Sequence, residues 1–330
     1  MKLQHLYPLL RELNDARFHS GEALAQRLGL TRAAIWKQVQ ALNRYPGVGI
    51  RSVRGKGYLL DPSLQLLDQQ AIEVRLPDRA GQHLRELHIL AETHSTNDWL
   101  RDRLPSHLHT GHACIAEYQH AARGRRGRRW ECSVGSNIYL SLAWRFDLGM
   151  ADLAGLSLAV GVSLARTLRE LGLETLGLKW PNDLYLDDRK LGGILVEASG
   201  EIAGPALAIV GVGINIRLGE ENARAIEQPW IDMASVLQAT PDRNRLAGDL
   251  LAGLLDTCLI YQKQGLTPFL EEWKKYDIYM GQEVVLHMGS QEITGTYCGL
   301  DERGGLVLRN SGGRRSWYAG EVSLRSVRSQ

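Results

Sequence analysis

The sequence has 330 residues, with 39 Lys or Arg against 37 Asp or Glu and a formal net charge of +2. This length exceeds one compact core and predicts two or three domains, with the composition of an ordinary globular protein. No apolar run approaches the roughly 20 residues that span a bilayer, and the acidic residues near the N-terminus, without a small-residue cleavage site, argue against a signal peptide. We therefore expect a cytoplasmic protein that does not contact a membrane.

The charge is distributed unevenly along the chain. Residues 1–62 contain ten Lys or Arg and four Asp or Glu, whereas the remaining residues contain 29 basic and 33 acidic side chains. A small basic segment attached to a near-neutral body indicates that DNA contact and another chemistry are divided between domains.

Two helices joined by a tight turn are predicted within residues 20–45. Ser20 can cap a helix through GEALAQRL that Gly29 ends, and Thr31 can cap a second helix along RAAIWKQVQALNRY. Ile35 and its helical neighbours Val39 and Leu42 recur at the spacing of a buried face. This pattern is typical of a helix-turn-helix, whose second helix enters the major groove.

A basic hairpin or wing follows in the segment GIRSVRGKGYLL, and Asp61-Pro62 marks a boundary. We expect a winged helix-turn-helix domain over residues 1–63, with a three-helix interaction module as the alternative. The predicted DNA-binding residues are Thr31, Arg32, Ala33, Trp36, Lys37, Gln40, Arg54 and Lys56.

The region 66–275 alternates strand-like and helical runs. Strands are predicted in ACIAEYQ, NIYLSLAWRF, GLKWPNDLYLDD, KLGGILVEASG and ALAIVGVGINIRL, and a long buried helix in residues 151–171. Several connections are too short for crossovers between parallel strands. We therefore expect an α+β domain with a mixed, largely antiparallel sheet.

Five arginines fall within seven residues in the segment RGRRGRR at 123–129, which Trp130 follows. Guanidinium groups match phosphate and carboxylate oxygens, and the glycines allow the backbone close to a ligand. We predict an anion-binding loop that orders when it is filled. A solvated basic loop, or one that touches nucleic acid, is the alternative from composition alone.

Other polar clusters fall at strand ends or in loops. THSTN at 93–97 precedes a helix and either caps it or binds a polar ligand, and Gln119 lies just ahead of the arginine loop. KWPND at 179–183 and KLGGIL at 190–195 place cations, an amide and a carboxylate near glycines, and GVGIN at 211–215 allows close packing against a flat group. Each segment taken alone also fits a hairpin connection or a tight strand crossing.

Four cysteines, Cys114, Cys132, Cys258 and Cys298, are widely spaced. Their spacing argues against a zinc site and a disulfide framework, and fits reduced structural thiols. Beyond them, residues 277–330 contain strand-like segments separated by turns, which predict a small β-barrel domain.

Taken together, STN, EYQ with RGRRGRRW, KWPNDLY, RKLGGILVE and GVGINI resemble the biotin protein ligases in order and spacing. With the winged helix in front, essentially the whole chain resembles the bifunctional biotin ligase and biotin operon repressors of bacteria. One departure is Ala122, which stands where the family loop usually has its first glycine. The resemblance implies a class II synthetase-like catalytic domain and an SH3-like C-terminal domain.

The resemblance further implies that biotin and ATP form biotinyl-5′-adenylate, from which biotin passes to a lysine of the biotin carboxyl carrier protein of acetyl-CoA carboxylase. Mg²⁺ would bridge the ATP phosphates, without a metal site made of protein ligands alone. The implied catalytic residues are Arg123, Arg125, Lys179, Asp183 and Lys190. Biotin would contact Ser95, Thr96, Asn97, Gln119, Arg123, Gly124, Arg125, Lys190 and Gly193. The nucleotide would contact Arg125, Arg128, Trp130, Asn182, Asn215 and Arg325.

DNA binding by a ligase requires a link between the two activities. We expect the adenylate to order the arginine loop and promote a homodimer, which would place two winged helices on a palindromic operator of the biotin operon. Two alternatives remain: a biotin-sensing repressor without ligase activity, and a lipoate ligase.

Overall fold

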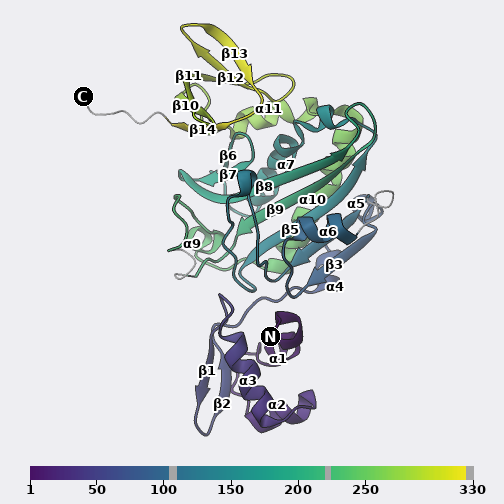
Figure 1. Ribbon diagram of the computed structural model, residues 1–330, viewed down its shortest axis with the longest axis vertical. Coiled ribbons are helices and arrows are strands. Elements are labelled where there is room, and N and C mark those ends of the chain that lie inside the picture. Colours follow the sequence, from purple (N-terminus) through teal and green to yellow (C-terminus); the bar gives the residue numbers. More distant parts are fainter. Residues whose placement is uncertain (104–109, 220–223, 325–330) are drawn as a thin grey trace, which may run out of the picture.

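The computed structural model describes residues 1–103, 110–219 and 224–324. A helical N-terminal domain lies at one end, a large sheet with its helices in the middle, and a small sheet at the other end (Figure 1).

The N-terminal domain contains three helices and a hairpin, as predicted for a winged helix-turn-helix. Their bounds are α1 Leu3–Glu12, α2 Gly21–Leu28, α3 Arg32–Leu42, β1 Ile50–Val53 and β2 Gly57–Leu60. Ser20 Oγ accepts from Ala23 N at 3.1 Å, Thr31 Oγ1 accepts from Ala34 N at 3.2 Å, and Gly29 takes a φ of 64°. Both predicted caps and the predicted glycine stop are therefore confirmed.

Helix α1 was not predicted. Its N-cap residue Lys2 makes no side-chain cap, Leu3 N instead donates to Glu92 Oε1 of the central domain at 2.9 Å, and Pro8 lies inside the helix. Its leucines recur at helical spacing and are buried against α3, so tertiary packing stabilises a helix that lacks local start signals.

The central sheet has seven strands in the order β3-β4-β5-β9-β8-β7-β6. Their bounds are β3 Glu86–Leu90, β4 His112–Ala116, β5 Asn137–Phe146, β6 Gly177–Lys179, β7 Asp183–Leu186, β8 Arg189–Gly200 and β9 Ala206–Asn215. Only the β3–β4 pair is parallel among these described strands. The predicted mixed, largely antiparallel sheet is confirmed.

Side-chain alternation on β5 separates the two faces of this sheet. Leu140 and Leu142 join the main core with helices α7 and α10, whereas Ala143 packs with Leu100 of helix α6 on the opposite face. The helices of the central region are α4 Gln69–Glu73, α5 Asp78–Gly81, α6 Thr96–Arg103, α7 Leu156–Glu170, α9 Met233–Leu237, α10 Arg243–Gln264 and α11 Thr267–Tyr276. Short 3₁₀ turns lie at Arg125–Gly127 and Met150–Leu153.

The segment Met150–Glu170 is long and apolar enough to cross a membrane by length and composition alone, a test that the core helix of a soluble protein also passes. Its apolar window is 67% buried inside the protein, and α7 packs against α10, α11 and β8. Helix α7 is apolar on most of its sides because other elements cover it there, as expected for a core helix.

The C-terminal domain is an antiparallel sheet of five strands in the order β13-β12-β11-β10-β14. Their bounds are β10 Glu283–Met288, β11 Gln291–Leu300, β12 Leu306–Asn310, β13 Gly313–Trp317 and β14 Glu321–Leu324. Trp180 Nε1 donates to Gly304 O at 3.1 Å, which fastens this domain to the turn before β7.

The N-terminal domain also contacts the central one through buried polar groups. Glu117, directly after β4, is fully buried and accepts from Tyr7 Oη and from the Arg243 guanidinium. Nearby, Tyr45 Oη donates to Glu92 at 2.9 Å.

Candidate active site

A cavity of about 960 Å³ opens on the α6 face of the central sheet. Strands β8 and β9 form part of its lining, together with the start of α6, the arginine loop 123–129, the turn between β6 and β7, and β14 of the C-terminal domain. The structure thus brings together segments that are far apart in the sequence. The predicted residues that line it are Ser95, Thr96, Asn97, Gln119, Arg123, Gly124, Arg125, Arg128, Trp130, Lys179, Asn182, Asp183, Lys190, Gly193 and Asn215.

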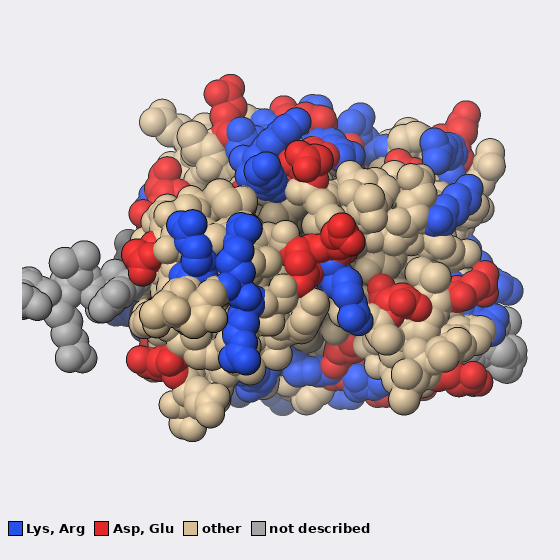
Figure 2. Space-filling view, turned by 90° about the horizontal axis from the view of Figure 1, so that it is seen from above, with Lys and Arg blue, Asp and Glu red and all other residues tan. Residues whose placement is uncertain are grey.

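Arg325, the remaining residue predicted for this site, lies outside the described residues. Seen from the end that carries the C-terminal sheet, basic and acidic side chains are interspersed over the surface (Figure 2). Neither positive nor negative side chains dominate the surface in that view. Which cationic side chains in the cavity can bind an anion therefore depends on the ion pairs that each of them forms locally.

The first turn of α6 presents a buried polar network to the cavity. Thr96 N donates to Gln119 Oε1 at 2.7 Å, and Ser141 Oγ donates to Asn97 Oδ1 at 2.6 Å and lies 2.7 Å from Thr96 Oγ1. Asp98 N donates to Ser95 Oγ at 3.4 Å. The helix-cap and ligand-binding alternatives of the sequence are therefore compatible, because one cluster provides both a cap and fixed donors and acceptors.

Arg123 is held by two carboxylates. Its guanidinium pairs with Asp98 and with Glu197, the latter at 2.9 Å. Hydrogen bonding to Asp98 raises the pKa of Arg123, and the same contact lowers the pKa of Asp98. With its charge compensated, Arg123 is suited to fixing the loop against α6 and β8 more than to carrying free charge to a phosphate.

Arg125 is the more available cation of the loop. It is partly buried, and its guanidinium donates to Asn182 Oδ1 at a long 3.4 Å. Burial lowers the pKa of Arg125, which means that its charge is incompletely solvated. Arg128 instead pairs with Glu321 on β14 at 2.5 Å, so the loop also contacts the C-terminal domain.

Two lysines lie near the turn between β6 and β7. Lys190 Nζ and Asp183 Oδ1 form an ion pair at 2.8 Å, with both side chains largely buried. Lys179 Nζ donates to Tyr185 Oη at 3.2 Å, and no carboxylate within the described ranges forms an ion pair with it. Burial lowers the pKa of Lys179, so this ammonium is a candidate for pairing with a ligand anion.

Trp130 packs on glycines in the floor of the cavity. A β-carbon at Gly213 would lie 3.1 Å from its Cε2 atom, and one at Gly193 would lie 3.4 Å from its Cζ3 atom. Trp130 Nε1 is buried and has no hydrogen-bond partner in the part of the chain that the structure describes. The glycines therefore leave room for a flat ring, as expected for the GVGIN segment.

Two asparagines fix the backbone around the cavity. Asn182 Nδ2 donates to Ile194 O at 2.7 Å, and Asn215 Nδ2 donates to Ile231 O at 3.2 Å. Their amides thus hold the turn and the end of β9 in place.

Ala122, the departure from the family loop, is buried with Cys132 and Tyr139. Its φ is not positive, so the backbone does not require glycine here. The extra methyl group is absorbed by packing.

The predicted DNA-binding residues lie on the exposed surface of α3 and of the β1–β2 turn. Trp36 is 55% exposed, and Lys56 Nζ lies 5.7 Å from the ring centroid of Phe18. All eight predicted residues are exposed.

Sequence reasoning missed the carboxylates that hold the arginine loop: Asp98, Glu197 and Glu321. Asp98 directly follows the STN motif, and Glu197 is the last residue of RKLGGILVE, which was the available signal. Glu321 pairs with Arg128 across 193 positions, for which the sequence carries no signal.

Comparisons with known proteins agree with this architecture. Residues 90–215 match the Biotin/lipoate A/B protein ligase family, 279–325 the Biotin protein ligase C terminal domain, and 5–59 an HTH domain. The chain is 43% identical over 319 residues to the "Bifunctional ligase/repressor BirA" of Salmonella typhimurium, and 42% identical to that of Escherichia coli, covering 97% of each chain. A solved biotin protein ligase from Aquifex aeolicus, in complex with biotin and ATP, is 29% identical and superposes with a TM-score of 0.61 over 73% of this chain and 99% of that one.

Proposed function

The chain belongs to the biotin protein ligase family, in the group of bacterial bifunctional ligase/repressors, and on that premise we propose how its residues carry both activities. The cavity activates biotin with ATP and transfers it to a lysine of a biotin carboxyl carrier protein, and the N-terminal domain represses a biotin operon. The observation that carries this proposal is the convergence of the motif residues on one cavity.

In the first step, a biotin carboxylate oxygen attacks the α-phosphorus of ATP. A P–O bond forms, and the bond to pyrophosphate breaks. Two anions must meet, so catalysis depends on neutralising and aligning them. Arg125 and Lys179 are the suited cations because carboxylates do not already hold them. Arg123 positions the loop through Asp98 and Glu197.

The biotin head group needs matched donors and acceptors in a buried pocket. The network of Ser95, Thr96, Asn97 and Gln119 supplies them near the start of α6. Trp130, beside Gly193 and Gly213, is placed to stack on the adenine ring.

Mg²⁺ fits this site as an ion carried by the ATP phosphates. Three of the carboxylates that line the cavity, Glu131, Asp183 and Glu321, each form an ion pair with a basic side chain. The metal would neutralise phosphate charge when bound.

In the second step, a carrier lysine attacks the acyl carbonyl. The C–N bond forms, AMP leaves, and the amine loses a proton. Asp183 can orient that amine once a ligand draws Lys190 away from it. The C-terminal domain borders the cavity through Glu321 and Val322, where an acceptor protein would approach. A reducing, cytoplasmic setting agrees with the four free cysteines.

Pyrophosphate release tests the first step. The purified chain is mixed with Mg·ATP and either biotin or lipoate, and an added apo carrier domain is then examined by mass spectrometry. Release with biotin and one biotinyl mass increment is expected. Tight biotin binding without release would favour a sensor that lacks ligase activity, and release with lipoate alone would favour a lipoate ligase.

The repressor role is tested with operator DNA. The adenylate is expected to convert a monomer to a dimer in gel filtration, and the dimer is expected to shift a palindromic operator in a native gel. The double substitution Lys37→Ala and Gln40→Ala should abolish the shift of the operator DNA. Arg11 is an exposed arginine on α1, and Arg11→Ala should leave the shift unchanged. A monomer at all concentrations would rule out the dimer mechanism.

A further inference from the structure

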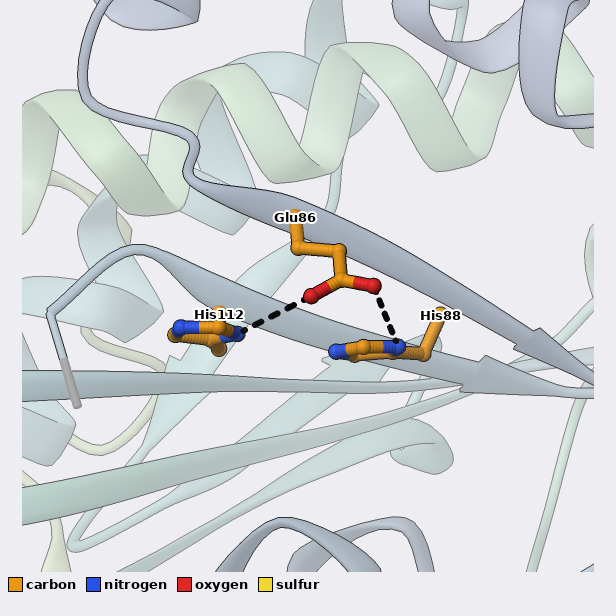
Figure 3. Close-up of side chains that lie close together, drawn as sticks. All are labelled: Glu86, His88 and His112. Carbon is orange, nitrogen blue, oxygen red and sulfur yellow. Dashed lines mark ion pairs between the residues drawn. The ribbon is translucent and has the colours of Figure 1, made fainter. Parts of the chain in front are cut away.

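Three side chains meet at an edge of the central sheet, and none of them lines the cavity. Glu86 and His88 come from β3, and His112 comes from β4 (Figure 3). Parallel pairing sets Glu86 opposite His112, and the two-residue period of a strand puts His88 on the same face as Glu86. The register of the sheet therefore brings together His88 and His112, which are separated by 23 intervening positions and belong to no sequence motif.

The two histidine rings are aimed at the Glu86 carboxylate. Its oxygens lie 3.4 Å from His88 Nδ1 and 3.8 Å from His112 Nδ1 (Figure 3). The His112 side chain is only 9% exposed, and its Nδ1 has no hydrogen-bond partner among the described residues. A buried ring nitrogen without a partner is uncommon, and it points to a missing ligand.

Packing holds both rings in place before anything binds. The His88 and His112 rings are stacked with centroids 5.8 Å apart, and Trp99 of α6 covers His88 at 4.6 Å. Burial is the main cause that lowers the pKa of both histidines. The charge of Arg103 also lowers the pKa of His88, and the charges of His88 and Arg85 also lower the pKa of His112. The Glu86 carboxylate acts in the opposite direction and raises the pKa of both histidines. The two rings are thus held side by side with Nδ1 of each facing the Glu86 carboxylate.

We propose that Glu86, His88 and His112 bind a divalent transition-metal ion, with zinc as the preferred ion. Two imidazoles and one carboxylate are donors that zinc accepts, and they suit magnesium or calcium poorly. The three donor atoms lie within 4.8 Å of one another. A tetrahedral zinc ion with bonds of about 2.0 Å holds its donors roughly 3.3 Å apart, so a small inward movement closes the set.

Glu86 is 57% exposed, which gives a bound ion access to solvent for its fourth ligand. The ion would fasten the edge strand β3 to β4. It would also support α6 through the contact between His88 and Trp99, and α6 carries Asn97 at the cavity.

Zinc binding by the full chain tests this proposal. The protein is stripped with a chelator and titrated with zinc against a chromophoric competitor, with the metal content measured after dialysis. One zinc ion per chain is expected, with an increase in melting temperature. Glu86→Gln changes an exposed side chain and should weaken zinc binding on the order of tenfold or more without unfolding the protein, and Glu86→Gln with His88→Gln should abolish it.

Glu292→Gln is the matched control. It removes the carboxylate that lies 3.3 Å from His287, in a pair with no third donor nearby among the described residues. This variant should bind zinc like the unmodified chain. Equal zinc uptake by the unmodified chain and the Glu86/His88 double variant would overturn the proposal, as would the absence of uptake by the unmodified chain.

Discussion

Trp130 covers Gly213 so closely that any side chain at Gly213 would press against the indole ring. The loop that carries the arginines is therefore anchored to the sheet at its C-terminal end by a flat contact. At its other end, Arg123 anchors it to α6 and β8 through carboxylates. Between these anchors, Arg126 takes a φ of 57°, a conformation that non-glycine residues rarely adopt.

Gly213→Ala should displace Trp130, since the new β-carbon would lie 3.1 Å from the ring. We expect adenylation to fall about tenfold in kcat/KM, equal to roughly 1.4 kcal/mol of transition-state stabilisation. Pyrophosphate release measures this loss. Gly219→Ala is the control because its β-carbon would meet nothing within 4 Å. Equal rates for the two variants would show that the indole position is unimportant.

Asp98→Asn should destabilise the protein by roughly 2 kcal/mol, because charge-assisted hydrogen bonds from Arg123 are lost. The contact with Arg123 lowers the pKa of Asp98 below its ordinary value of 3.8. The stabilisation is therefore fully present above that value and is lost as the pH falls further below it. Melting temperatures between pH 7 and pH 3 should show the two proteins converging at the acid end. Asp102→Asn, whose side chain is 69% exposed, should show little effect.

Lys179 should set the alkaline limit of adenylation. Burial lowers its pKa from the ordinary 10.5, so its charge is lost at a lower pH than that of an exposed lysine. Lys179→Arg keeps a charge throughout this range and should move the alkaline limb of the pH–rate profile upward, even if the maximum rate falls severalfold. An unchanged alkaline limb would assign the titration to another group.

Ala122→Gly should restore the glycine that is usual in the family loop and should loosen it. Ala122 is 6% exposed and packs with Cys132 and Tyr139, so we expect a loss of about 1 kcal/mol in stability. The bound adenylate should also dissociate several times faster, which a chase with unlabelled biotin measures. Slower dissociation in the variant would indicate that the methyl group strains the loop.

Much of the fold was predictable because apolar runs bounded by turns are strong local signals. The predicted strand NIYLSLAWRF coincides with β5, and the predicted strand KLGGILVEASG lies within β8. Helix α1 was not predicted because its cap comes from the distant Glu92 and because Pro8 lies within its sequence. The predicted strand ACIAEYQ ends earlier, at Ala116, where Glu117 leaves the ladder for its buried contacts.

The members of the candidate site were predictable from motifs, but their partners were not. The sequence indicated a set of cations around an anion. In the structure, Arg123 and Lys190 already have carboxylate partners, whereas Arg125 and Lys179 have none within residues 1–103, 110–219 and 224–324. Such pairs join residues that are distant in sequence, and only the packed chain decides which of them form.

The buried Glu117 limits how this protein can be divided. Its carboxylate accepts hydrogen bonds from Tyr7 of the N-terminal domain and from Arg243 of the central domain. It also lies two residues before Gln119, which lines the cavity. A chain truncated after residue 62, so that it begins at residue 63, would expose the Glu117 carboxylate to water and would lack the Tyr7 hydroxyl that donates to it. A ligase that lacks the DNA-binding domain would therefore have a disturbed contact next to its cavity. Substitutions at the newly exposed surface would be needed before such a truncated enzyme reached the full rate.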